Sequence, residues 1–342
     1  MNIRQNFTIN TINKWMLPIA MLTGASSYLL YHIMPEPVHR LGPFLSGMVS
    51  LAQPLLIFAM LFLTFCRIEP KELKPHRWHW WLLFIQGGLF SILGLVAFLL
   101  MRLFPQWGTD WVVLIESAML CLICPTASAA AVVTRKLGGD VPGITTYVVL
   151  INLVTAILVP LIVPLVHPVS DVTFWMAFSM IMAKIFPLLI LPCFFAWVVR
   201  YMAPRLHRWL LGYPDLPFYL WAVALTLAIA ITTRSIVYTT VGVSLLMMMS
   251  LISLVCCALQ FALGRYVGSC YRPRRRSTPV HVEERGREVR KVTSGQALGQ
   301  KNTVFAIWMA CTFMTPVTAI VGGLYSIWHN IYNSYQLRKI SN

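Results

Sequence analysis

Long apolar segments follow one another along almost the whole 342-residue chain, separated by short polar stretches. About twenty apolar residues in helical conformation are enough to cross the hydrocarbon core of a bilayer. On that measure the pattern predicts ten transmembrane helices, at residues 15–34, 43–66, 79–101, 111–133, 141–167, 173–200, 217–232, 237–265, 297–315 and 318–335. We therefore expect an all-α polytopic membrane protein embedded in the lipid bilayer.

The composition agrees with this prediction, since 58% of the residues are hydrophobic and only 11% are charged. Soluble domains carry about 25% charged residues. The net charge of +16 would suggest nucleic-acid binding in a soluble protein. Here the basic residues flank the apolar segments, where they mark the cytoplasmic side of a membrane, so we expect no nucleic-acid partner.

The distribution of the basic residues predicts the orientation of the chain. With a cytoplasmic N-terminus and ten spans, 22 of the 27 lysines and arginines fall on the cytoplasmic side, and only Arg40, Arg102 and Arg234 fall outside. The remaining two, Lys184 and Lys301, lie within spans. This asymmetry favours both termini in the cytoplasm of a bacterium-like cell, with the protein in its cytoplasmic (inner) membrane.

Five spans followed by five that enter from the opposite face indicate an inverted repeat. The first repeat would cover residues 1–167 and the second residues 168–342. The polar segment 266–296, rich in arginine, is expected to be a flexible basic cytoplasmic loop.

The fourth span is interrupted by Cys124-Pro125-Thr126-Ala127-Ser128. Proline removes a backbone donor and breaks the helical ladder, which leaves carbonyl groups that need partners. These groups, with the hydroxyls of Thr126 and Ser128, could bind a cation or a substrate. A simple proline kink satisfied by neighbouring helices is an equally good interpretation.

The ninth span begins with a second polar run that contains Gln300, Lys301, Asn302 and Thr303. Such a run is a poor lipid-facing helix, so it should line protein or water. The alternative is that Lys301 lies at the cytoplasmic end of the span and extends to the surface. Two interrupted helices in matching positions of two halves indicate the binding site of a transporter.

Four further polar residues lie within predicted spans: Gln86, Glu116, Asn152 and Lys184. Ionisable groups inside a membrane are functional candidates by default, although Glu116 could instead form a structural pair with a lysine. We recognise no nucleophile, acid–base pair or metal-ligand spacing, and the eight cysteines mostly lie in apolar stretches. We therefore expect no catalytic residues, no metal site and no cofactor.

Several motifs together resemble the bile acid:sodium symporter (BASS) family. In the first half these are Cys124-Pro125 followed by small and hydroxyl residues, Val132-Val133-Thr134, Gly139-Asp140-Val141, and Pro160 with Pro164. In the second half they are Gly299, Asn302 and Thr303, and the run from Tyr325 to Asn330. The resemblance implies ten helices in two inverted repeats, with broken helices 4 and 9 crossing where sodium binds. It also implies a core domain and a panel domain, the panel made of helices 1, 2, 6 and 7.

The chain departs from this family pattern at the sodium ligands and thus looks like a divergent member. The family's Ser-Asn pair in helix 4 falls on Ala130 and Ala131, and its helix 9 glutamate falls on Ala297. Its glutamine falls on Lys301, whereas Gln86 and Asn302 match. Sodium prefers several oxygen ligands, and this chain replaces a carboxylate site with an ammonium.

These departures lead to the hypothesis that Lys301 stands in for sodium. A fixed ammonium would fill the vacated charge site, or a lysine that loses its proton would couple transport to protons, because burial disfavours the charged form. We expect a secondary transporter of a small organic anion that works by alternating access and is proton-coupled or uncoupled. The alternatives are a sodium-coupled symporter of bile-acid-like anions, and a channel or non-transporting sensor.

Overall fold

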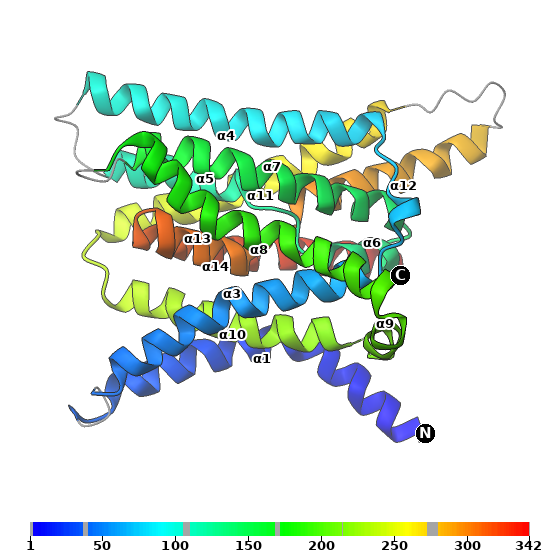
Figure 1. Ribbon diagram of the computed structural model, residues 1–342, viewed down its shortest axis with the longest axis horizontal. Helices are drawn as coiled ribbons and strands as arrows, with labels where there is room; N and C mark the ends of the chain where they lie inside the picture. The colour runs from blue at the N-terminus through cyan, green and yellow to red at the C-terminus, as the bar shows by residue number, and fades with distance from the viewer. Residues whose placement is uncertain are drawn as a thin grey trace.

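The computed structural model describes residues 3–36, 40–104, 110–167, 172–213, 215–271 and 280–341, with the side chains of 3–17, 280–282 and 340–341 left out. Its regular structure in these ranges is helical and includes no β-strand (Figure 1). The long helices are α1 (Ile3–Ile33), α3 (Gly42–Cys66), α4 (Arg77–Leu103), α7 (Val141–Val166), α8 (Phe174–Met202), α10 (Leu216–Val237), α11 (Val243–Cys270), α12 (Val280–Gly299) and α14 (Ala319–Ser341). The short ones are η1 (Pro70–Glu72), α5 (Asp110–Ile123), α6 (Ala130–Lys136), α9 (Pro204–Leu211), α13 (Thr303–Phe313) and η2 (Pro316–Thr318).

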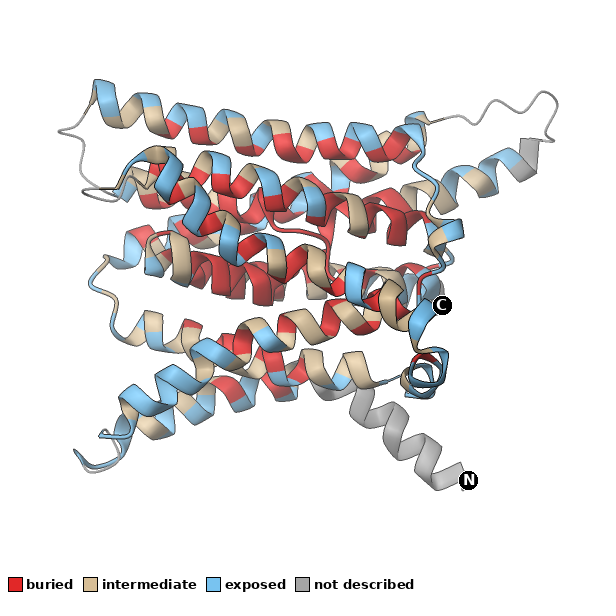
Figure 2. Cartoon of the chain, viewed as in Figure 1, coloured by how far each residue is buried: buried red, intermediate tan, exposed pale blue. Residues whose placement is uncertain are grey.

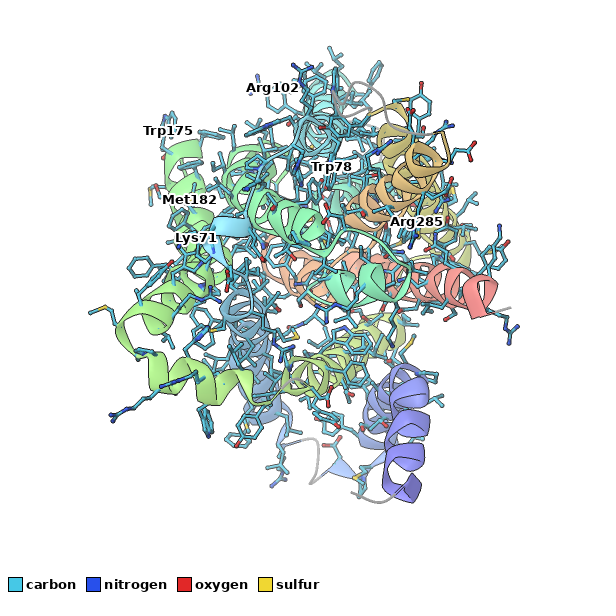
Figure 3. All side chains as sticks on the ribbon, turned by 90° about the vertical axis from the view of Figure 1, so that its right-hand side faces the viewer. Lys71, Trp78, Arg102, Trp175, Met182 and Arg285 are labelled. Carbon is cyan, nitrogen blue, oxygen red and sulfur yellow. The ribbon has the colours of Figure 1, made fainter. Side chains whose placement is uncertain are left out.

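Six of these helices are long and apolar enough to cross a membrane: α3, α4, α7, α8, α10 and α11. Their outward faces carry large apolar side chains that are mostly exposed, such as Phe84 at 73% exposure and Trp175 at 69%. Figure 3, which looks along the bundle, shows Trp175 at its rim. Exposed apolar surface of this extent suits contact with lipid, so the chain is a multi-pass membrane protein.

The predicted fourth and ninth spans are each divided into two helices. α5 and α6 are separated by residues 124–129, and α12 and α13 by residues 300–302. The seventh span is longer than expected, because α10 continues to Val237. The short helix α9, with Arg205 and Arg208 beside apolar residues, was not predicted.

The expectation of a flexible loop at 266–296 is wrong for the part that the structure describes. Residues 266–270 continue α11 and residues 280–296 belong to α12, while 272–279 lie outside the described residues. The polar helix α12 is supported by close packing on α11, where the Cα atoms of Gly264 and Gly268 lie against the backbone of Ser294 and Arg290. Its exposed surface carries the Glu288–Lys291 ion pair, and the hydrogen bond from Lys291 lowers the pKa of Glu288.

Two groups of helices lie side by side in the bundle (Figure 1). In one, α1 packs on α10, α10 on α3, and α3 on α8. In the other, α4, α5, α7, α11, α12, α13 and α14 pack on one another. The two groups meet where α8 packs on α7, α10 on α13 and α14, and α3 on α13. Buried residues concentrate in the middle of the bundle, around α5, α7 and α13 (Figure 2). The two helix breaks therefore lie where the protein, and not lipid, surrounds them.

Candidate functional site: the crossing of two helix breaks

The two breaks meet as a short antiparallel β-bridge between Thr126 and Lys301. The amide of Ala127 donates to the carbonyl of Gln300 at 2.9 Å, and the amide of Asn302 donates to the carbonyl of Pro125 at 2.8 Å. Backbone groups that the breaks release thus bind one another across the crossing. We call residues 124–128 and 299–303 the crossing.

The carbonyl groups at the end of α5 are satisfied by side chains from four other segments. An α-helix leaves its last four carbonyls without partners inside the helix. The carbonyls of residues 121–124 accept hydrogen bonds from Gln260 at 3.1 Å, Lys301 at 3.1 Å, Thr155 at 3.1 Å and Gln86 at 3.0 Å, in chain order. The C-terminal end of α5 is therefore held by tertiary contacts rather than by a local cap.

The Lys301 side chain is buried, and its amine lies at the C-terminal, negative end of a helix. Its side chain is only 1% exposed, and its Nζ atom donates to the carbonyl of Leu122 in the last turn of α5. Cations are favoured at helix C-termini, where the carbonyl dipoles gather. The alternative in which Lys301 reaches the membrane surface does not agree with this burial.

The second break is held in the same way. Thr126 Oγ1 donates to the carbonyl of Ala297 at 2.6 Å, and the Tyr325 hydroxyl donates to the carbonyl of Gly299 at 2.8 Å. The side chain of Asn302 accepts a hydrogen bond from the amide of Phe305 at 3.2 Å and so caps the N-terminus of α13. Thr303 is the first residue of that helix and is buried.

The structure thus brings together six of the residues predicted for the site: Gln86, Thr126, Gln300, Lys301, Asn302 and Thr303. Ser128 lies at the end of the first break and is half-buried. Asn152 is buried on α7, and both of its amide atoms lack a hydrogen-bond partner among the described residues.

Glu116 lies away from the crossing. It is fully buried near the start of α5, where it forms an ion pair with His167 at the end of α7 and accepts a hydrogen bond from the amide of Thr315 at 3.3 Å. Six residues along α5 separate it from Leu122, a rise of about 9 Å. Its partner is a histidine and not the lysine we considered. Among the described residues, Glu116 is also the only buried carboxylate, so the crossing has none.

Lys184 projects from α8 with its side chain exposed, and its Nζ atom lies 5.6 Å from the centre of the Phe313 ring at the end of α13. It is therefore on the surface of α8 that faces the second broken helix. The structure does not bring it to Lys301.

Three residues of the site were missed by sequence reasoning. Tyr147 donates to Gln86 Oε1 at 2.9 Å and orients that amide, while Gln260 bridges the end of α5 and the hydroxyl of Tyr325. An amide within the apolar eighth span was the available signal for Gln260. Tyr325 lies in the motif that resembles the BASS family, but no role was assigned to it.

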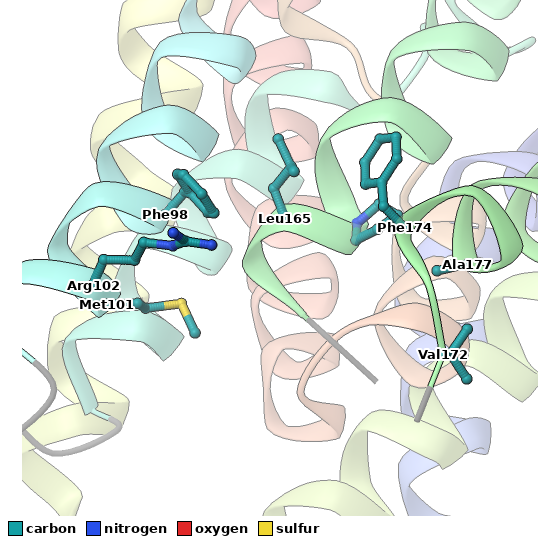
Figure 4. Close-up of a pocket in the computed structure, with 8 residues that line it drawn as sticks. Phe98, Met101, Arg102, Leu165, Val172, Phe174 and Ala177 are labelled. Atoms are coloured by element: carbon teal, nitrogen blue, oxygen red, sulfur yellow. The ribbon is translucent and has the colours of Figure 1, made fainter. Parts of the chain in front are cut away.

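A pocket of about 350 Å³ lies elsewhere, between the ends of α4 and α7 and the start of α8 (Figure 4). It is lined mainly by apolar residues, and the guanidinium of Arg102 lies 4.8 Å from the centre of the Phe98 ring. None of the crossing residues lines it, so we do not assign the pocket to the candidate site.

The comparison with known families agrees with this architecture. A model of the SBF-like CPA transporter family matches residues 20–337, a stretch that includes both helix breaks. No curated protein matches the chain. Because the match covers nearly the whole chain, the resemblance inferred from the motifs is confirmed. The chain belongs to the SBF-like CPA transporter family, membrane transporters of the bile acid:sodium symporter type.

Proposed function

We propose that the protein is a secondary transporter of a small organic anion in which Lys301 takes the place of sodium at the crossing. The chain would form ten transmembrane helices in two inverted repeats, residues 1–167 and 168–342. The group α1, α3, α8 and α10 would be the panel and the remaining long helices the core. Substrate would reach a site at mid-depth as the core rocks against the panel.

The observation that supports this proposal most is the position of the Lys301 ammonium. It is buried at the point where two broken helices meet, and it is bound to a backbone carbonyl of α5. The crossing has no carboxylate among the described residues, and hard cations such as sodium need several oxygen ligands. Ala297, Ala130 and Ala131 offer no side-chain oxygen at the positions that the family resemblance associates with sodium.

An anionic substrate is favoured by the charges around the breaks. The N-terminus of α13 begins at the crossing, and helix N-termini favour negative charge. Lys184 on α8 lies close to the end of the same broken helix and could meet an anion between panel and core. The ammonium proton of Lys301 is the candidate coupling ion, and transport without a coupling ion is the simpler form of the same proposal.

A thermal-shift screen of purified protein tests the proposal. Carboxylates and sulfonates, from pyruvate to taurocholate, are added across a range of pH, with sodium or with choline as the only salt cation. We expect stabilisation by at least one anion that does not require sodium. The stabilising anion is then used in vesicles, where saturable uptake and counterflow are expected of a carrier.

Three other outcomes would support different functions. Sodium-dependent stabilisation would favour a sodium-coupled symporter. Flux without saturation or counterflow would favour a channel, and binding without flux a membrane sensor. A Lys301→Gln variant that transports normally, with unchanged pH dependence, would contradict the role given to Lys301.

A further inference from the structure

One face of α14 carries a row of mostly buried polar side chains, of which only Tyr325 also contacts the crossing. The row consists of Tyr325, Ser326, His329, Asn333 and Gln336, and Gln296 of α12 lies against it. Ser326, His329, Asn333 and Gln296 are each at most 4% exposed. From Tyr325 to Gln336 the helix rises about 16 Å, close to half the thickness of a bilayer's hydrocarbon core.

Several atoms of this row lack a hydrogen-bond partner within the described residues. They are Ser326 Oγ, His329 Nδ1, Asn333 Nδ2 and Gln296 Oε1. Leaving a buried polar group unpaired destabilises a fold, because the group gives up its hydrogen bonds to water and gains none in return. Four such groups in one row are more than a stable core tolerates without water, because buried polar groups in native proteins nearly always have partners.

The spacing of these atoms suits water. Ser326 and His329 are three residues apart on the helix, so their side chains are neighbours. Gln296 Nε2 already donates to Asn333 Oδ1 at 2.9 Å, which brings the free atoms of both amides close together. A buried water typically makes about three hydrogen bonds to groups of this kind.

The row connects two distinct places. At one end, Tyr325 binds the Gly299 carbonyl at the crossing and is hydrogen-bonded to Cys257. The titratable side chains near Lys301 at the crossing are the thiols of Cys121, Cys124, Cys256 and Cys257. At the other end, Gln336 is half-buried near the end of α14, on the side of the bundle where both chain ends lie (Figure 1).

We infer that this face of α14 binds a file of water molecules that joins the crossing to the side of the membrane where the chain ends lie. If the proposed function is correct, the file is the route by which Lys301 exchanges its proton. The water sites themselves depend only on the unpaired atoms of α14 and α12.

Hydroxyl-radical footprinting with mass spectrometry tests the inference, because radicals generated from bound water modify the side chains beside it. In wild-type protein in lipid nanodiscs we expect modification of His329 and Tyr325. The internal reference is the equally buried Phe305 on α13, corrected for intrinsic reactivity. Modification of His329 and Tyr325 no greater than that of Phe305 would overturn the inference.

Substitutions in the row test which side chains bind the water. Asn333→Leu and Gln296→Leu remove its binding groups, and we expect each to lose the modification at His329. Ser334→Leu is the matched control, since Ser334 is exposed on the neighbouring position of the same helix, and it should leave the footprint unchanged. If either leucine variant does not fold, the wild-type footprint still decides the question.

The two proposals fail in different ways. A normal footprint together with a Lys301→Gln variant of unchanged pH dependence would retain the water file and remove its proton role. An absent footprint would overturn the file whatever the transport assays show.

Discussion

The Lys301 amine is bound by the protein backbone and not by a carboxylate. Its ammonium has three donors, and among the described residues it makes one hydrogen bond, to Leu122. A hydrogen bond to a charged group contributes about 1.5–3 kcal/mol. The cost of removing a charge from water is several kcal/mol even after the protein relaxes. We therefore expect burial of the Lys301 ammonium to lower the stability of the fold.

We accordingly predict that Lys301→Met keeps or raises the melting temperature of the purified protein, because an apolar side chain of similar length avoids the cost of burying charge. The measurement is thermal unfolding in detergent followed by tryptophan fluorescence. Lys339→Met, at an exposed position near the end of α14, is the control and should change little. A fall of many degrees in Lys301→Met alone would show that the ammonium stabilises the crossing.

The Glu116–His167 pair is predicted to have the opposite role and to stabilise the fold. Glu116→Gln keeps an acceptor for the amide of Thr315 but removes the charge opposite His167. Breaking a fully buried pair costs about 3–5 kcal/mol. Because the His167 side chain is about a third exposed, we expect about 1–2 kcal/mol, discounted for screening by solvent.

Thermal unfolding also measures this effect, as a melting temperature lowered by several degrees. Glu284→Gln on the exposed surface of α12 is the matched control. Equal melting temperatures for Glu116→Gln and wild type would mean that the ion pair contributes nothing to stability.

For single residues, the sequence indicated which side chains were unusual but not which other residues they bind. Gln86, Thr126, Lys301 and Asn302 stood out because a polar group inside an apolar span needs a partner. That Lys301 binds Leu122 could not be predicted, since the contact joins residues 179 positions apart. The same holds for Glu116, whose position in α5 was clear but whose partner depends on where α7 ends.

Among the elements, the helical pair α11–α12 shows most clearly what sequence patterns leave out. The positions of the apolar spans were predicted from hydropathy, although several ends were not, such as that of α10 at Val237. The helix α12 is polar and was expected to be a loop. It is a helix because α11 provides a surface for it, and helical stability in proteins comes mostly from such packing. The breaks in α5–α6 and α12–α13 were predictable because proline, glycine and amide residues interrupt apolar helices.

Gly264 is predicted to be essential to this pair. A Cβ atom there would lie 2.4 Å from the carbonyl oxygen of Ser294, a backbone atom that cannot rotate away. Gly264→Ala should therefore force α12 away from α11 and lower the stability by about 1–3 kcal/mol, the usual cost of overpacking.

The matched control is Gly88→Ala on α4, where a Cβ atom meets nothing within 4 Å. It should be neutral or slightly stabilising, because alanine favours a helix over glycine by about 1 kcal/mol. Thermal unfolding of the two variants side by side gives the test. An unchanged Gly264→Ala melting temperature would show that the two helices are not closely packed.

For the whole molecule, the orientation in the membrane remains a prediction from the basic residues. Alkaline phosphatase needs disulfides, which do not persist in a reducing cytoplasm. We predict that the enzyme is inactive when it is fused after Asn342, on the expected cytoplasmic side. It should be active when fused after Phe104, which follows the C-terminal end of α4 and is expected on the outer side. Activity of the C-terminal fusion would contradict ten spans with both termini in the cytoplasm.

We propose that an ammonium occupies the crossing, where relatives of this type are expected to hold sodium. The most direct test of this claim is the thermal stability of the wild-type protein and of the double variant Ala297→Glu/Lys301→Gln, each titrated with sodium against a choline background. We predict no sodium-dependent stabilisation of the wild type and a clear rise in melting temperature for the double variant, which restores a carboxylate and an amide oxygen. Stabilisation of the wild type by sodium would contradict the claim.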